Sequence, residues 1–149
     1  MGLGRIFNTE DSWGLLLLRL GLGCIFMAHG AQKLFGWFGG AGFQTTIQNF
    51  QQGLNIPMEL TVLAMIAEFF GGLGVLAGCL TRVAALGLCS VMIVAIVKVH
   101  LVNGFFMNWF CLEGQGHGIE FNLALLAMSA CLVISGGGEA SVDKWLSEQ

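Results

Sequence analysis

The sequence predicts an all-α integral membrane protein, in which residues 1–149 form a single domain of four membrane-spanning helices packed as a bundle. Composition is the first reason. Apolar residues make up 56% of the chain and charged residues only 10%, whereas soluble domains carry about 25% charged residues. The second reason is the presence of long apolar segments, because backbone groups in lipid must be satisfied within a helix. The expected spans are residues 13–30, 58–80, 83–102 and 119–135.

The segment after the first span predicts a short amphipathic helix at the membrane surface, in the first outer loop. Aromatic residues come first, as they do where a helix leaves a membrane: Phe35, Trp37 and Phe38. Phe43, Ile47 and Phe50 then recur three to four positions apart between polar residues. That spacing places them on one face of a helix, which suits a helix that lies in the interface with its apolar face toward lipid.

The connections and the basic residues predict the topology. The dipeptide Thr81-Arg82 leaves room only for a tight turn, so the second and third spans are expected to form an antiparallel hairpin. Arg5, Arg82 and Lys144 lie on one side of the predicted bundle, and Lys33 lies on the other side. Because cytoplasmic loops carry the excess of basic residues, both termini are expected in the cytoplasm.

Ionisable residues within or near the ends of the spans are the candidate functional residues, because charge inside a membrane is costly and usually functional. At ~1.5 Å per residue most of them lie toward the outer side. We therefore expect a polar pocket in the outer half of the bundle, with ligand-binding or proton-path groups. The candidates are Arg19, His29, Lys33, Glu68, Lys98, His100 and Glu120. Lys98 and His100 are two positions apart, so only one of them is expected to face the interior.

Three narrower interpretations stay open at this stage. Arg19 and Glu68 lie on antiparallel neighbours and are expected to form an ion pair, which either serves function or only fixes helix packing. His29 precedes Gly30 and fits either a ligand contact or a satisfied helix-end histidine. Histidine and carboxylate groups inside bundles can also bind metals. No HxxxH or ExxH spacing on one helix supports such a site, whose members would be His29, His100, His117, Glu68 and Glu120.

Missing motifs argue against several other classes of function. Lysine and arginine are not clustered, so nucleic acid is not an expected partner. The five cysteines contain no CxxC motif, and their odd number argues against a disulfide framework. The sequence also lacks a flavin or nicotinamide fingerprint and a haem-attachment motif.

Several motifs together resemble the DoxX family of small bacterial membrane proteins. The most specific is the string HGAQKLFGWFGG at residues 29–40. Supporting pieces are RLG at residues 19–21, EFFGG at residues 68–72 and GIEFNL at residues 118–123. The resemblance covers nearly the whole chain and implies a four-helix protein of the bacterial cytoplasmic membrane. It also implies a link to redox chemistry, because family members are associated with thiosulfate:quinone oxidoreductases and with membrane complexes that detoxify oxidants.

The expected function is that of a small membrane subunit or accessory protein of a quinone- or thiol-linked redox system. It would bind a small amphipathic ligand in the outer pocket, with a quinone as the candidate cofactor. Its expected partners are the lipid bilayer, a redox enzyme subunit or a second copy of the chain. The alternatives are a small-solute carrier or exporter without redox chemistry, and a purely structural partner of a larger complex. The sequence assigns no catalytic residue.

Overall fold

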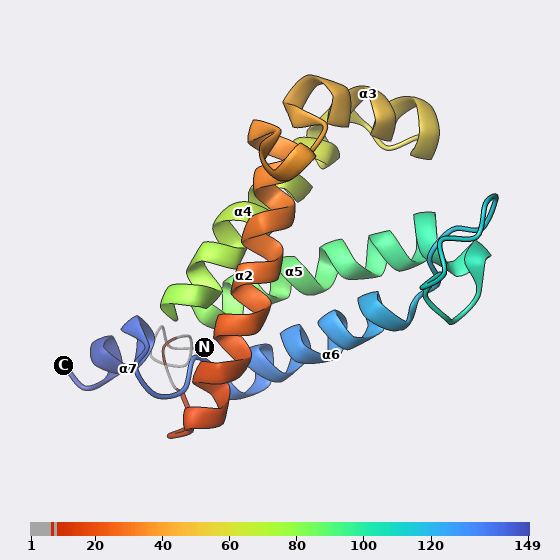
Figure 1. Cartoon of the computed structure of the whole chain (residues 1–149). Helices are drawn as coiled ribbons and strands as arrows, with labels where there is room; N and C mark the ends of the chain where they lie inside the picture. Colours follow the sequence, from red (N-terminus) through yellow and green to blue (C-terminus); the bar gives the residue numbers. More distant parts are fainter. Residues whose placement is uncertain (1–6, 8) are drawn as a thin grey trace.

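The computed structural model describes residue 7 and residues 9–149, and these residues form helices and loops with no β-strand among them. The prediction of an all-α chain is therefore confirmed. The principal helices are α2 (Trp13–Phe35), α3 (Gly42–Leu54), α4 (Met58–Ala77), α5 (Thr81–Ala95), α6 (Glu120–Ser135) and α7 (Val142–Ser147) (Figure 1). A 3-10 turn at Trp37–Gly39 follows α2, and a π-helical turn at Ile96–His100 and a 3-10 turn at Leu101–Asn103 prolong α5.

Three helical stretches are long and apolar enough to cross a membrane: Trp13–Phe35, Met58–Ala77 and Thr81–Asn103. They correspond to the first three predicted spans. The fourth, α6, is apolar but has 16 residues, which is about 24 Å of helix and short of the ~30 Å hydrocarbon core. A membrane crossing by α6 therefore stays a prediction. The first helix continues five residues beyond its predicted end, and Gly36 ends it in the left-handed conformation, φ 71°.

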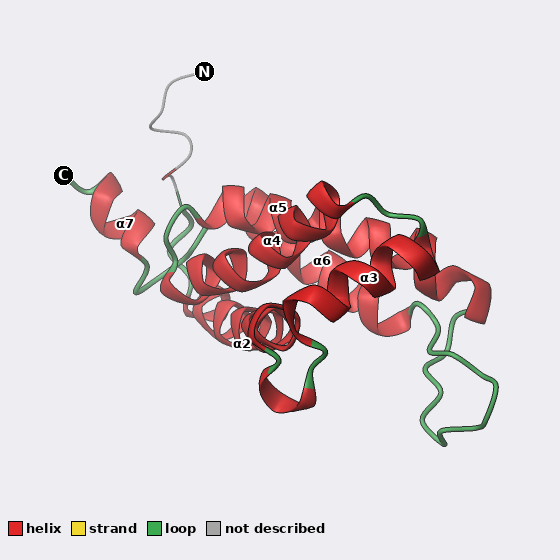
Figure 2. Ribbon diagram, turned by 90° about the horizontal axis from the view of Figure 1, so that it is seen from above, coloured by secondary structure: helices red, strands yellow, loops and turns green. Residues whose placement is uncertain are grey.

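The helices are arranged as two pairs that diverge from a common end. Helix α2 packs along α4, α5 packs along α6, and α4 meets α5 through the turn at residues 78–80. Figure 1 shows the two pairs running in different directions, and Figure 2 shows α2 nearly end-on while α5 and α6 extend away from it. The start of α2, the α4–α5 turn and α7 lie together at what we call the terminal end. The opposite ends of the two pairs, with α3 and loop 104–119, are the loop ends.

Glycines explain why α2 and α4 pack so closely. A Cβ at Gly23 would lie 2.8 Å from the carbonyl oxygen of Gly72, and a Cβ at Gly30 would lie 2.5 Å from the backbone nitrogen of Phe69. The two backbones therefore touch at two levels, as small residues permit in membrane helix pairs. This contact brings residue 68 of α4 beside the last turns of α2.

Helix α3 has the amphipathic character that the sequence predicts. Only Thr46 and Ile47 are buried among its 13 residues, where it packs against α2 and α4. Its glutamines at positions 44, 48, 51 and 52 are exposed. Figure 1 shows α3 at the loop end of the α2–α4 pair. Its position at the surface of a bilayer stays a prediction.

Candidate functional site

A buried ion pair joins α2 to α4 near their loop end. The ammonium group of Lys33 contacts both carboxylate oxygens of Glu68. The side chain of Glu68 is 4% exposed and that of Lys33 is 27% exposed. Because a buried carboxylate without a partner would be costly, the contact with Lys33 compensates for the burial of Glu68. The approach at Gly30 sets the register that aligns the two side chains.

His29 lies one turn before Lys33 and opens into a cleft at the same level. The histidine is exposed, and Gln32 lies one turn after it on the same side of α2. Lys33 and Glu68 lie close enough to interact with His29 electrostatically. The cleft has a volume of about 290 Å³ and separates α2 from the first turn of α6. Its lining residues are Ile25, Ala28, His29, Gln32, Phe38 and Phe121. The cleft thus combines apolar walls with two polar groups, as small-molecule sites commonly do.

A second polar group lies on the α5–α6 pair and holds loop 104–119 in place. The Nδ1 atom of His100 lies 2.8 Å from the carbonyl oxygen of His117. Glu120 accepts hydrogen bonds from the backbone nitrogen of Met107 at 2.9 Å and from the indole of Trp109 at 3.1 Å. These contacts give His100 and Glu120 a structural role in the loop. Lys98 is exposed within the π-helical turn.

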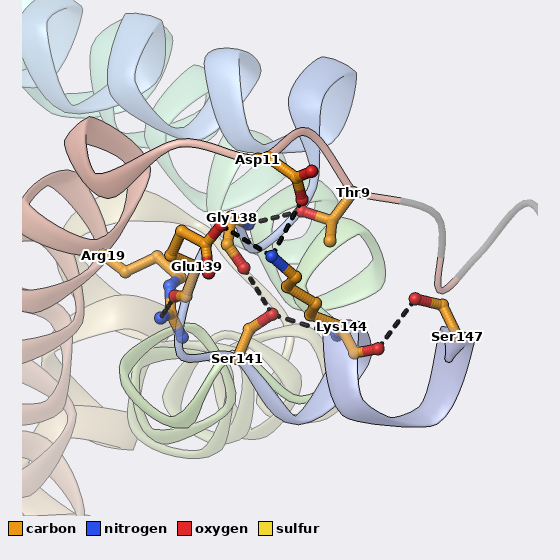
Figure 3. A network of polar contacts seen from close by, with 8 residues as sticks. All are labelled: Thr9, Asp11, Arg19, Gly138, Glu139, Ser141, Lys144 and Ser147. Carbon is orange, nitrogen blue, oxygen red and sulfur yellow. Dashed lines mark hydrogen bonds and ion pairs between the residues drawn. The ribbon is translucent and has the colours of Figure 1, made fainter. Parts of the chain in front are cut away.

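Arg19 belongs to a third group, at the terminal end. Its guanidinium donates hydrogen bonds to the carbonyl oxygens of Leu76, Glu139 and Ala140 at 3.4, 3.0 and 3.1 Å. Figure 3 shows it reaching the chain before α7, among the contacts of Glu139, Ser141 and Lys144. The predicted ion pair between Arg19 and Glu68 is therefore wrong. The physical reason is that the C-terminal segment folds back over α2 and offers carbonyls to Arg19, while Lys33 already neutralises Glu68.

The seven candidate residues do not converge in one outer pocket, as the sequence predicted they would. The structure brings together His29, Lys33 and Glu68, whereas Arg19 lies ten residues before His29 on α2, about 15 Å along the helix. Lys98, His100 and Glu120 lie on the diverging α5–α6 pair. Among the described residues, no three of His, Cys, Asp and Glu come close enough to hold a metal ion. The residues considered as metal ligands lie in two separate places. His29 and Glu68 lie on the α2–α4 pair, and His100, His117 and Glu120 lie on the α5–α6 pair and its loop.

The similarity to known proteins decides the family. The family model described as DoxX matches residues 14–101. The chain belongs to the DoxX family. The matched part of this DoxX protein begins with α2 and ends just after the π-helical turn, so it contains Arg19, His29, Lys33 and Glu68. Helix α6 and the C-terminal segment lie beyond it.

Curated relatives match nearly the whole DoxX chain. "Putative oxidoreductase CatD" of Bacillus subtilis is 30% identical over 139 residues, 93% of this chain and 91% of the relative. "Uncharacterized membrane protein Rv3486" of Mycobacterium tuberculosis is 29% identical over 150 aligned residues, 97% of this chain and 88% of the relative. "Inner membrane protein YqjF" of Escherichia coli is 27% identical over 138 residues, 91% of this chain and 94% of the relative. No solved structure matches the chain significantly.

Several residues of the cleft were not among the sequence candidates. Gln32 could have been found, because it lies three positions after His29 and hence on the same face of a helix. Phe38 and Phe121 carry no local signal that distinguishes them from the other aromatic residues near the interface. Asp143, which binds the start of α5 at the terminal end, was also missed, because its polar surroundings in the sequence resemble an ordinary tail.

Proposed function

We propose that this DoxX protein is a small membrane subunit or accessory protein of a redox system, and that it binds an amphipathic small molecule in the cleft beside His29. One observation carries the proposal. An exposed histidine and a glutamine open into a cleft with otherwise apolar walls, directly beside the buried Lys33–Glu68 pair. Ionisable groups in membrane-spanning helices usually line pathways or ligand sites. A headgroup would bond His29 and Gln32, and its tail would extend into lipid.

A quinone is the ligand class that best suits this arrangement. Its reduction takes up two protons with two electrons, and histidine is the side chain whose ordinary pKa is nearest neutrality. His29 would donate a proton to a carbonyl oxygen of the quinone ring. Glu68 and Lys33 would stabilise the charge that develops on the quinone during its reduction. The electrons would come from a redox enzyme subunit that docks on this protein. The name of the Bacillus relative as a putative oxidoreductase supports this class of function.

We further propose that α6 completes a fourth crossing of the bacterial cytoplasmic membrane, with both termini in the cytoplasm. In support, the backbone nitrogen of Glu139 bonds the carbonyl oxygen of Ser12 at 3.2 Å, so the chain after α6 returns to the start of α2. Arg82 and Lys144 lie at this terminal end, whereas Arg5 lies outside the described residues. One relative is named an inner membrane protein.

Single-cysteine labelling in intact cells tests the topology. A variant that retains only Cys111, which is exposed in loop 104–119, should react with a membrane-impermeant maleimide added from outside. A variant that retains only Cys79, in the α4–α5 turn, should react only after the cells are opened. Ser147→Cys in a cysteine-free chain should behave like Cys79. Labelling of Cys111 only from the cytoplasmic side would contradict the orientation, and labelling of residue 147 from outside would contradict the fourth crossing.

Replacement of His29 tests the site. We expect His29→Ala to abolish binding of a short-chain benzoquinone to protein in lipid nanodiscs, and to abolish rescue of oxidant sensitivity in a deletion strain. Its abundance in the membrane should stay near that of the wild type, because His29 is exposed and its loss leaves no cavity. Gln48→Ala, an equally exposed change on α3, is the matched control and should preserve both activities. Full rescue and unchanged binding by His29→Ala would refute the proposed site.

A further inference from the structure

Phe38 holds a backbone conformation that phenylalanine rarely adopts. Its φ of 54° and ψ of 33° lie in the left-handed region, which is strained for a residue with a Cβ. Gly36 and Gly39 on either side have φ of 71° and 74°, so glycine is the residue that this loop favours. Burial does not compensate for the strain, because the side chain of Phe38 is 74% exposed. Strained residues that folding does not require occur often at ligand sites.

The strained residue is nevertheless fixed in position. Gln32 donates a hydrogen bond to the carbonyl oxygen of Phe38 at 3.5 Å. The loop lies so close to α2 that a Cβ at Gly40 would come within 2.3 Å of the carbonyl oxygen of Gln32. The ring of Phe38 also packs edge-to-face on Trp37, with the centroids 6.4 Å apart. Phe38 is thus held at the cleft of His29 by the same glutamine that lines it.

A second phenyl ring reaches this cleft from the other helix pair. Phe121, in the first turn of α6, is 39% exposed and lines the cleft together with Phe38. Among the ring contacts of the described residues, neither of these two stacks on the other. The cleft therefore has one aromatic ring from each pair and, between the pairs, the polar groups of His29 and Gln32.

We propose that Phe38 and Phe121 form an aromatic clamp that selects ligands with a flat conjugated ring. The inference rests on the proposed ligand site and names the two residues that would select its ligand. Aromatic side chains prefer offset or edge-to-face contacts with another ring, which an acyl chain cannot provide. Oxygen substituents on the ring reach His29 and Gln32. A cleft of about 290 Å³ suits a headgroup of this kind and leaves its tail in lipid.

Anchoring in the membrane interface does not explain Phe38. Trp37 is 57% exposed in the same loop and is absent from the residues with positive φ. Trp37 can therefore act as the interfacial aromatic residue of this loop without backbone strain. The left-handed backbone of Phe38 instead orients its ring toward the cleft.

The test compares two probes of equal tail length in nanodiscs: a benzoquinone with a decyl tail, and decanol, which lacks the ring. The wild type should bind the benzoquinone more tightly than decanol. Phe38→Leu and Phe121→Leu should each weaken benzoquinone binding about three- to tenfold and leave decanol binding unchanged, because each loses one ring contact. Phe110→Leu, a change of the same kind at an exposed ring outside the cleft, is the matched control and should bind both probes as the wild type does.

Phe38→Gly separates the clamp from a structural role. Glycine relieves the left-handed strain, so this variant should melt at or above the wild-type temperature while it binds benzoquinone more weakly. Equal binding of both probes by the wild type, or unchanged benzoquinone binding by the Phe38 and Phe121 variants, would overturn the clamp and leave the His29 site standing. Failure of the wild type to bind either probe would overturn the proposed function together with the clamp.

Discussion

Asp143→Ala is expected to destabilise the protein more than any other single change in the C-terminal segment. The carboxylate of Asp143, which is 1% exposed, accepts hydrogen bonds from the backbone nitrogens of Leu80 and Thr81 at 2.7 and 2.8 Å. These are the amide groups of the residue before α5 and of its first residue. Loss of the carboxylate leaves the buried backbone nitrogen of Thr81 and the partly buried one of Leu80 without their partner. The cost is about 1–3 kcal/mol for the buried donor and less for the partly buried one. The buried guanidinium of Arg19 also loses a nearby negative charge. We expect a thermal midpoint lower by about 6–12 °C in detergent.

Lys144→Ala is the matched control for this prediction. Hydrogen bonds to the carboxylates of Glu139 and Asp11 raise the pKa of Lys144 above its ordinary value of 10.5. Any stability from this shift is complete below pH 10.5 and is lost only above it, so it does not vary near neutrality. The side chains of Lys144 and Glu139 are 22% and 23% exposed and that of Asp11 is 77% exposed, so water reaches these ion pairs and screens them. The variant should therefore melt close to the wild type. Equal midpoints for Asp143→Ala and Lys144→Ala would contradict the role given to Asp143.

The helices could be predicted from the sequence because lipid leaves few choices to an apolar segment. Composition and segment length correctly predict three long apolar helices and the amphipathic α3. The divergence of the two pairs could not be predicted in the same way. Apolar residues cover most faces of these helices, so hydrophobic pattern does not fix which faces meet or at what angle. The glycines mark the faces at which two helices touch, but the sequence does not say which helix each glycine contacts.

The partners of the charged residues show the same limit. The sequence predicts Arg19 as the partner of Glu68. Lys33 is the partner because α2 continues five residues beyond its predicted end. The terminal nitrogens of Arg19 bond carbonyls of residues 76, 139 and 140, and backbone acceptors have no signature in a sequence. A polar segment such as residues 136–149 resembles a free tail until its fold is known.

Breaking the Lys33–Glu68 pair is the second change with a large expected effect. Lys33→Met leaves the nearly buried carboxylate of Glu68 without its cation. Removal of one partner from a fully buried pair costs about 3–5 kcal/mol. The cost here should fall near the lower end of that range, because the Lys33 side chain is 27% exposed and water screens part of the charge. Glu68→Met should cost less than Lys33→Met, since the ammonium group left behind can extend toward the interface.

The double variant Lys33→Met, Glu68→Met distinguishes packing from function. It removes both charges and keeps side chains of similar length, so it should recover most of the stability lost by Lys33→Met, as apolar replacement of buried ion pairs often does. Thermal midpoints of the wild type, both single variants and the double variant give the coupling between the residues. If the pair acts with His29 at the cleft, the stable double variant should still fail to rescue oxidant sensitivity. Rescue by a stable double variant would make the pair a packing device, and additive losses of stability would show that the two residues do not act on each other.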